Sequence, residues 1–311
     1  MHKKISVGLA ITISLIIVVI TATITTIATM TAYSSIVSDI PEREKMYSSI
    51  SDIDTLVRSN YYGNVDENAV NTGIANGYLS SLDGYNQILS KAEYEQFRNK
   101  SEGIDSDGNE IRTVTYKKFG TAGYVKFHDF NSNTAKEFAD AYDILSNNSV
   151  TSLILDVRNT DSINIDTAAD IIDMIVPIAS DGTGAIATAT GKDGKAVKVY
   201  SSDAESISMP IAVIVNGETS GAGELIACDI RDFGKGTVVG EKTKGNGTYQ
   251  QIFELSDGGA VILTVARLTP YMSDSYNGTG VTPDYTSEQT EATDDLNKDN
   301  QFLQAYAIVI S

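Results

Sequence analysis

The sequence predicts an α/β fold, and two kinds of segment support that prediction. Apolar runs at 150–158 (VTSLILDVR) and 209–216 (MPIAVIVN) are typical of strands covered on both faces. Segments with helical periodicity alternate with them, at 134–145 and 221–233. Strands that alternate with helices in this way form a largely parallel sheet, so we expect helices on both of its faces.

The other elements of the C-terminal region follow in chain order. A strand is predicted at 123–127 and a helix around 168–176, and segments 185–190 and 195–201 flank a KDGK turn as a hairpin. Beyond the helix at 221–233, further strands are predicted at 237–243, 249–255 and 260–268, and a short helix near 300–310. We assign 123–311 to one α/β core.

The N-terminal region divides into an anchor and a helical part. Residues Ile5 to Met30 carry no charge and are longer than the ~20 residues needed to cross a bilayer. Lys3 and Lys4 precede this run and no Lys or Arg follows before Arg43, so we expect residues 1–32 to hold a cytoplasmic stub and a transmembrane helix, with the remaining chain extracytoplasmic. A cleaved signal peptide, which would leave a secreted domain, is the alternative.

Residues 33–104 read as a polar helical region, including a helix over YNQILSKAEYEQF with Ser90 as N-cap. Residues 105–122 read as a connecting turn. Their DSDGNE segment resembles a calcium loop, but its Gly stands at the fourth position, where the motif requires the sixth. We therefore expect a turn and no metal site.

Composition excludes several functions. With 23 Lys and Arg against 41 Asp and Glu, the net charge of −18 repels phosphate groups, so nucleic acid is not an expected partner. The single cysteine, Cys228, excludes an intrachain disulfide or a cysteine-cluster zinc site, and it reads as a small buried hydrophobe. A triad hydrolase could use only His128, which has no partnering motif.

The most informative segment is the glycine-rich turn that joins the strand at 209–216 to the helix beginning at Gly221 to Gly223. A helix N-terminus stabilises developing negative charge, as a nucleophile site requires. On spacing alone, an ordinary strand-to-helix turn explains the segment better.

Here the residues resemble the carboxy-terminal processing (tail-specific) serine protease family. Three family motifs occur in order, and an LILDVRN segment resembles the family's strand ending in D-L-R-N. The matching residues are Asn216, Thr219, Ala222 and Glu224, then Gly240, Glu241, Thr243, Gly245, Gly247, Thr248 and Gln250, then Thr269, Pro270, Gly280, Val281, Pro283 and Asp284. The resemblance implies a crotonase-like core of twisted sheet with flanking helices, and a serine-type peptidase site without a cofactor.

The catalytic positions depart from that pattern. In the family a serine attacks the peptide carbonyl and a neutral lysine accepts its proton. The serine position is Gly221 here and the lysine position is Asn246, while Gln250, aligned with the residue that orients the lysine, is retained. An amide cannot accept a proton near neutral pH, and loss of one member of such a unit typically costs about 10⁶ in turnover.

The turn that completes the family's oxyanion hole, R-N-N-P-G-G, is replaced by residues 158–163 (RNTDSI). The glycine pair is lost, and Asp161 brings a negative charge towards that place. The family's PDZ domain of roughly 80 residues has no room in the short stretch before Gly123.

An active enzyme remains possible if Ser220 and Lys244 act as a displaced nucleophile and base. Moving one residue at a helix start turns the side chain by about 100°, so we expect Ser220 to serve as a helix cap instead. Glu224, in the first helical turn, is expected to stabilise the helix N-terminus.

The sequence therefore favours a membrane-anchored, catalytically inactive module, with an active serine endopeptidase using Ser220 as the alternative. A peptide or protein ligand is expected in the vestigial cleft formed by Gly221, Ala222, Arg158, Asn159 and Asn246. The resemblance also suggests a homodimer, or a heterodimer with an active relative.

Overall fold

The computed structural model describes residues 17, 20–21, 23–26, 29–30, 40–82, 84–178, 184–203, 206–290 and 293–311. Most of the predicted anchor, Ile5–Met30, lies outside these residues. Within the described part, no helix combines the length and the apolar character needed to span a bilayer. The chain forms two compact units, Met1–Thr72 and Gly73–Ser311.

The first unit contains α2 (Ile40–Asn60) and the beginning of α3 (Glu67–Ser80). Arg58, near the end of α2, forms ion pairs with Asp54 at 2.8 Å and with Glu67 at 2.6 Å. These pairs fix the turn between the two helices, although their exposure to solvent limits the stability that they contribute.

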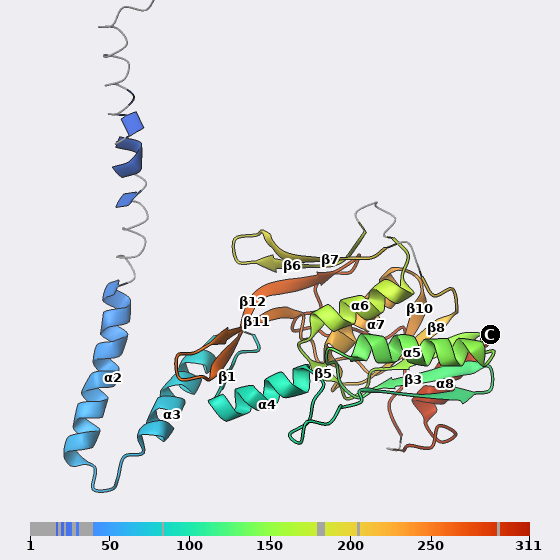
Figure 1. Cartoon of the computed structure of the whole chain (residues 1–311), viewed down its shortest axis with the longest axis horizontal. Helices are drawn as coiled ribbons and strands as arrows, with labels where there is room; N and C mark the ends of the chain where they lie inside the picture. The colour runs from blue at the N-terminus through green and yellow to red at the C-terminus, as the bar shows by residue number, and fades with distance from the viewer. Residues whose placement is uncertain are drawn as a thin grey trace, which may run out of the picture. The chain divides into compact units, whose positions relative to one another are not determined.

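A six-stranded sheet organises the second unit (Figure 1). Its spatial order is β13-β10-β8-β4-β3-β2, and all neighbours are parallel except the edge pair β2–β3. The strands are β2 (Val114–Phe119), β3 (Ala122–Phe127), β4 (Ser152–Asp156), β8 (Ile211–Val215), β10 (Gly236–Gly240) and β13 (Tyr285–Thr286). The predicted α/β class with a mainly parallel sheet is confirmed.

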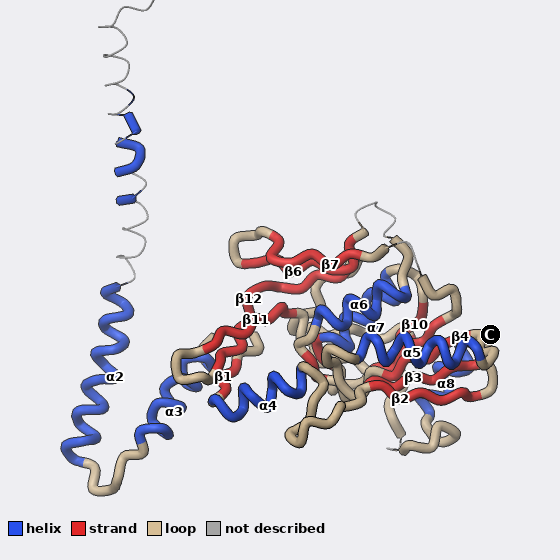
Figure 2. Tube along the Cα trace, in the orientation of Figure 1, coloured by secondary structure: helices blue, strands red, loops and turns tan. Residues whose placement is uncertain are grey.

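Helices cover both faces of this sheet (Figure 2). One face packs against α5 (Thr134–Asn147), α6 (Ile165–Ile175) and α7 (Ala222–Asp232), and the other packs against α8 (Asn300–Val309). Along β4, Leu153 and Leu155 belong to the first core and Ile154 to the second. Burial on both faces explains why the strand sequence is apolar without alternation.

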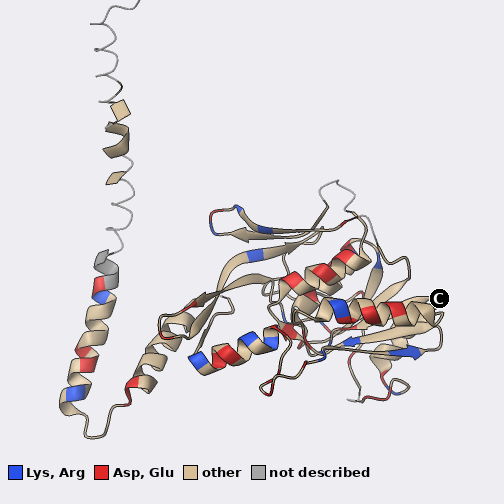
Figure 3. Cartoon of the chain, viewed as in Figure 1, with Lys and Arg blue, Asp and Glu red and all other residues tan. Residues whose placement is uncertain are grey.

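Acidic residues recur along α5 and α6 (Figure 3). Asp166, Asp170 and Asp173 follow one another on α6. Partial burial and the charges of its two neighbours raise the pKa of Asp170. The acidic residues of these two helices contribute to the net negative charge of the sequence.

An antiparallel sheet extends from the core. It contains β1 (Gln87–Leu89), β6 (Ala185–Gly191), β7 (Ala196–Ser201), β11 (Thr248–Glu254) and β12 (Ala260–Pro270). The β6–β7 pair is the hairpin predicted around the KDGK turn. Helix α4 (Lys91–Ser101) follows β1, and the hydroxyl of its N-cap Ser90 accepts from Glu93 N, as predicted. The helix predicted over YNQILSKAEYEQF is therefore shorter than expected, because Gln87–Leu89 pair with β12 as a strand.

A third, two-stranded sheet was not predicted. The short strands β5 (Asp161–Ser162) and β9 (Ser220–Gly221) pair in parallel, with Asp161 opposite Ser220 and Ser162 opposite Gly221. Two-residue strands carry no periodicity, so only the tertiary contact reveals them. This small sheet fixes the turn before α7.

Candidate functional site

Gly221 is the residue from which the candidate site is built. It is the N-cap of α7 and has φ 60° and ψ −108°, a backbone conformation that L side chains rarely adopt. A Cβ atom at this position would lie 2.2 Å from the backbone oxygen of Ser162. The space that a side chain needs at residue 221 is therefore occupied by β5.

Glu224 joins the start of α7 to the segment 243–246. Its buried carboxylate accepts from the backbone N–H groups of Gly221 at 3.0 Å, Gly245 at 2.7 Å and Asn246 at 2.7 Å, and from the Thr243 hydroxyl. Burial raises the pKa of Glu224, and the four donors lower it by a smaller amount. The net shift of this pKa is therefore upwards. The predicted stabilising role of Glu224 at the helix N-terminus agrees with these bonds, and the residue also positions Asn246.

Asn246 and Gln250 lie on the segment that Glu224 holds in place. The Asn246 amide nitrogen is 3.8 Å from where a Cβ of Gly221 would stand, so the structure brings the two predicted positions together. Gln250 Nε2 donates to the backbone oxygen of Tyr85 at 3.2 Å, while the buried Gln250 Oε1 has no hydrogen-bond partner. Both side chains line a cavity of about 330 Å³, here called the Asn246–Gln250 cavity.

The walls of this cavity include residues that the sequence did not indicate. Tyr85 and Phe97 come from the region before the core, and Phe130 and Ile163 from loops of the core. Lys100 also lines it and forms an ion pair with Asp129 at 2.7 Å. Ile163 belongs to the segment 158–163 that replaces the family's oxyanion turn. Tyr85 and Phe97 are identified only by the packing of β1 and α4 beside the core.

In the displaced pair of Ser220 and Lys244, the lysine is engaged by Asp161. Lys244 Nζ lies 2.7 Å from Asp161 Oδ2, and this hydrogen bond raises the pKa of Lys244. Partial burial raises the pKa of Asp161, but Lys244 and the Ser220 hydroxyl outweigh burial and hold it below its usual value. A lysine kept charged in this way cannot accept a proton from serine.

Ser220 is not the helix cap that the sequence suggested, because the N-cap residue is Gly221. Ser220 lies in β9 with a fully buried side chain, and its hydroxyl makes no hydrogen bond of normal geometry within the described chain. Pairing of β9 with β5 turns this residue away from the capping position.

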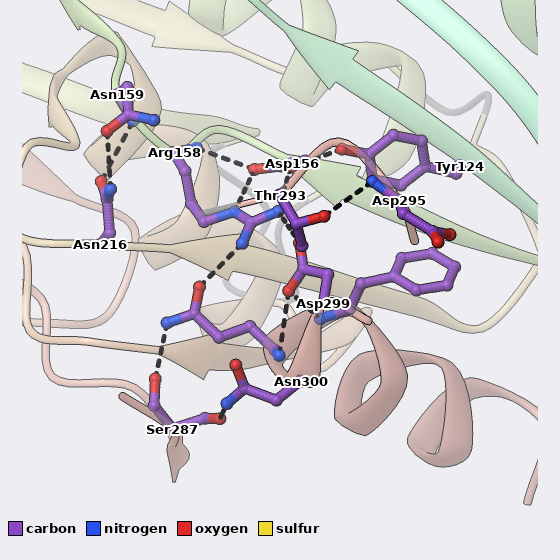
Figure 4. Close-up of polar contacts among 12 residues, drawn as sticks. Tyr124, Asp156, Arg158, Asn159, Asn216, Ser287, Thr293, Asp295, Asp299 and Asn300 are labelled. Atoms are coloured by element: carbon purple, nitrogen blue, oxygen red, sulfur yellow. Dashed lines mark hydrogen bonds and ion pairs between the residues drawn. The ribbon is translucent and has the colours of Figure 1, made fainter. Parts of the chain in front are cut away.

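Arg158 belongs to a buried polar network rather than to the cleft (Figure 4). Its guanidinium contacts Asp156 at 2.6 Å, Asp299 at 2.7 Å and Gln301 Oε1 at 2.9 Å. Burial lowers its pKa, but the hydrogen bonds and charges of the two aspartates raise it by more, so the group stays charged. The prediction that Arg158 lines the groove is corrected, since its side chain joins β4 to the start of α8.

The other predicted groove residues also lie differently. Asn159 has φ 61° and exchanges hydrogen bonds with Asn216, which accepts from its backbone N–H and donates to its side chain. Ala222 is completely buried in the core. Neither residue lines the Asn246–Gln250 cavity.

His128 and Cys228 stand apart from the site, as expected. His128 Nε2 lies 3.0 Å from the Thr115 hydroxyl. Burial lowers the pKa of His128, and the positive charge of Lys126 lowers it further. Burial raises the pKa of the Cys228 thiol to about 12, so this thiol stays protonated at neutral pH.

Comparison with known proteins identifies the family. The sequence model of peptidase family S41 matches residues 121–287, more than half of the chain. The chain belongs to peptidase family S41. The matched range covers Gly221, Asn246 and Gln250 together with β5.

Two curated relatives are C-terminal processing enzymes. The chloroplastic C-terminal processing peptidase of Tetradesmus obliquus is 34% identical over 165 residues, which are 52% of this chain and 34% of that protein. The carboxyl-terminal-processing protease of Synechocystis sp. is 30% identical over 169 residues, 54% of this chain and 38% of that protein. The chain thus matches between a third and two fifths of these relatives' length.

Two solved structures have a similar fold. A photosystem II D1 C-terminal processing protease superimposes with a TM-score of 0.51 at 30% identity, over 58% of this chain and 50% of that one. A lipoprotein from Streptococcus agalactiae reaches a TM-score of 0.54 at 19% identity, over 72% and 75% of the two chains, and supports the fold alone.

Proposed function

We propose that this S41 domain is catalytically silent and acts as a peptide- or protein-binding module on a crotonase-like core. The observation that carries the proposal is the position of the Ser162 carbonyl oxygen, which lies 2.2 Å from where a Cβ atom of residue 221 would stand. The resemblance to the tail-specific proteases assigns the serine nucleophile to this residue. Glycine supplies no nucleophile, and the position leaves no room for one.

Two further features support a silent site. The residue at the lysine position, Asn246, presents an amide that cannot act as a base near neutral pH. The nearby Lys244 is held charged by Asp161, which argues against the displaced pair. An active endopeptidase that uses Ser220 is therefore the weaker reading.

The activity test uses the full chain in detergent, incubated with a fluorophosphonate serine probe and, separately, with casein and unstructured C-terminal tails. We expect neither labelling nor cleavage, with the Synechocystis carboxyl-terminal-processing protease as the active control. The matched variant is Ser220→Ala. Labelling or cleavage of the native chain that disappears in this variant would establish the endopeptidase and overturn the proposal.

We further propose that the N-terminal run Ile5–Met30 holds the domain on the outer side of the cytoplasmic membrane. The uncharged length of the run and the position of Lys3 and Lys4 support this placement. After alkaline extraction of membranes we expect the chain in the pellet, with its C-terminal domain digested by protease added outside intact spheroplasts. Release of a shortened chain into the medium would instead indicate signal cleavage.

The partner is expected to be an unfolded peptide segment, with an active relative or a second copy as the alternative. Cross-linking the full chain in its native membrane, followed by mass spectrometry, separates these possibilities. Cross-links from the Asn246–Gln250 cavity to unstructured segments favour peptide binding. Cross-links confined to folded surfaces of another subunit favour a scaffold.

A further inference from the structure

The Asn246–Gln250 cavity contains a buried hydrogen-bond acceptor without a donor. Gln250 is only 8% exposed, and its Nε2 is committed to the Tyr85 carbonyl oxygen at 3.2 Å. That bond fixes the orientation of the amide, since a carbonyl oxygen needs a donor. Gln250 Oε1 is buried and left without a partner, and Gln250 is one of the residues that line the cavity. A buried acceptor in this state favours a ligand that brings an N–H or O–H group.

Asn246 supplies the complementary group on the same wall. Its Oδ1 accepts from the Thr248 hydroxyl at 2.6 Å, a distance typical of an O–H donor and an oxygen acceptor. This contact assigns the oxygen of the Asn246 amide, so its nitrogen is the atom available for a ligand. Asn246 is 2% exposed and lines the cavity with Gln250. Asn246 Nδ2 and Gln250 Oε1 therefore offer a donor and an acceptor on two residues that line the cavity together.

The charges around the cavity are already paired. Among the described residues that line it, the basic one is Lys100, which lies 2.7 Å from Asp129. Lys244, which approaches Asp161 at the same edge, is paired at 2.7 Å as well. A ligand carboxylate would lose its water here without gaining a free cation, and it would stand near the two aspartates.

We propose that the Asn246–Gln250 cavity binds a neutral carboxamide of a peptide segment, whether from an Asn or Gln side chain or from the backbone, in preference to a free carboxylate. A carboxamide offers an N–H to Gln250 Oε1 and an oxygen to Asn246 Nδ2. The aromatic rings of Phe97 and Phe130 supply apolar wall for the rest of the residue. This inference rests on the proposed binding function and specifies the chemistry of its ligand.

Benzamide and benzoate are the matched probes, because they share one shape and differ in the group that the cavity would recognise. Binding of each to the full chain in detergent micelles is titrated by saturation-transfer NMR. We expect benzamide to bind at least tenfold more tightly than benzoate. Equal binding, tighter binding of benzoate, or no binding of benzamide would overturn the proposal, and none of these outcomes depends on a variant.

Variants then locate the site. Gln250→Met keeps the length of the side chain and removes the acceptor, and we expect it to weaken benzamide at least tenfold. Gln251→Met is the control, since Gln251 follows on β11 with an exposed side chain and is not among the cavity residues. Equal effects of the two changes would refute the site. Catalytic silence is judged separately by the fluorophosphonate probe, so failure of one proposal leaves the other standing.

Discussion

Gly221→Ala is expected to destabilise the Gly73–Ser311 unit by about 3 kcal/mol or more. The new Cβ would stand 2.2 Å from the Ser162 backbone oxygen, and the residue would keep a positive φ of 60°. Overpacking against backbone costs about 1–3 kcal/mol, and the left-handed conformation adds about 1–2 kcal/mol. Urea unfolding, followed by near-ultraviolet circular dichroism of the tyrosines, measures the change.

Gly278→Ala separates the two contributions. Gly278 also has a positive φ, 72°, but a Cβ there would meet nothing within 4 Å. We therefore expect a loss of only about 1 kcal/mol. If the two variants lost the same free energy of unfolding, the Ser162 carbonyl would not be the obstacle that we describe.

The same obstacle governs any attempt to restore catalysis. Gly221→Ser together with Asn246→Lys returns both family side chains, but the serine must displace β5. We expect this double variant to show no reaction with the fluorophosphonate probe. Activity gained by the double change alone would mean that Asp161–Ser162 moves aside easily.

Arg158→Met is expected to cost about 3–5 kcal/mol, because it leaves Asp156 and Asp299 buried without their shared cation. The side chain is only 6% exposed, so water cannot replace the lost contacts. The effect should appear as a lower urea midpoint with loss of the α8 packing. Arg98→Met is the control, since its contact with Glu102 at 4.0 Å is solvent-exposed and should contribute under about 1 kcal/mol.

A triple variant tests the cause of the Arg158 effect. Adding Asp156→Asn and Asp299→Asn to Arg158→Met removes the unpaired charges while the amides keep part of the hydrogen bonding. We expect the triple variant to be more stable than Arg158→Met alone. A triple variant that is less stable would indicate that packing of the guanidinium, and not charge, dominates.

The parallel core could be predicted from the sequence because its strands are covered on both faces. In β4 this burial makes Leu153, Ile154 and Leu155 apolar in succession, which is a local signal. The nearness of Gly221 and Asn246 was likewise predictable, from the order and spacing of family motifs. The first inference required only residues that are adjacent in sequence. The second required only positions that the family motifs define.

The environment of Arg158 could not be predicted in this way. Its partner Asp299 lies 141 residues further along the chain, and no periodicity connects them. The aromatic wall of the Asn246–Gln250 cavity was missed for a similar reason, because Tyr85 and Phe97 come from a region that reads only as helical. The sequence did contain one hint. Asp156 stands two residues before Arg158, and its carboxylate could have suggested an internal ion pair.

The bonds of Glu224 have an evolutionary consequence. Three of its four donors are main-chain N–H groups, at Gly221, Gly245 and Asn246. Main-chain donors are present whatever residue occupies a site, proline excepted. These three bonds would therefore survive substitution of the side chains at positions 221 and 246, so both residues could change during evolution without loss of the link between the start of α7 and the segment 243–246.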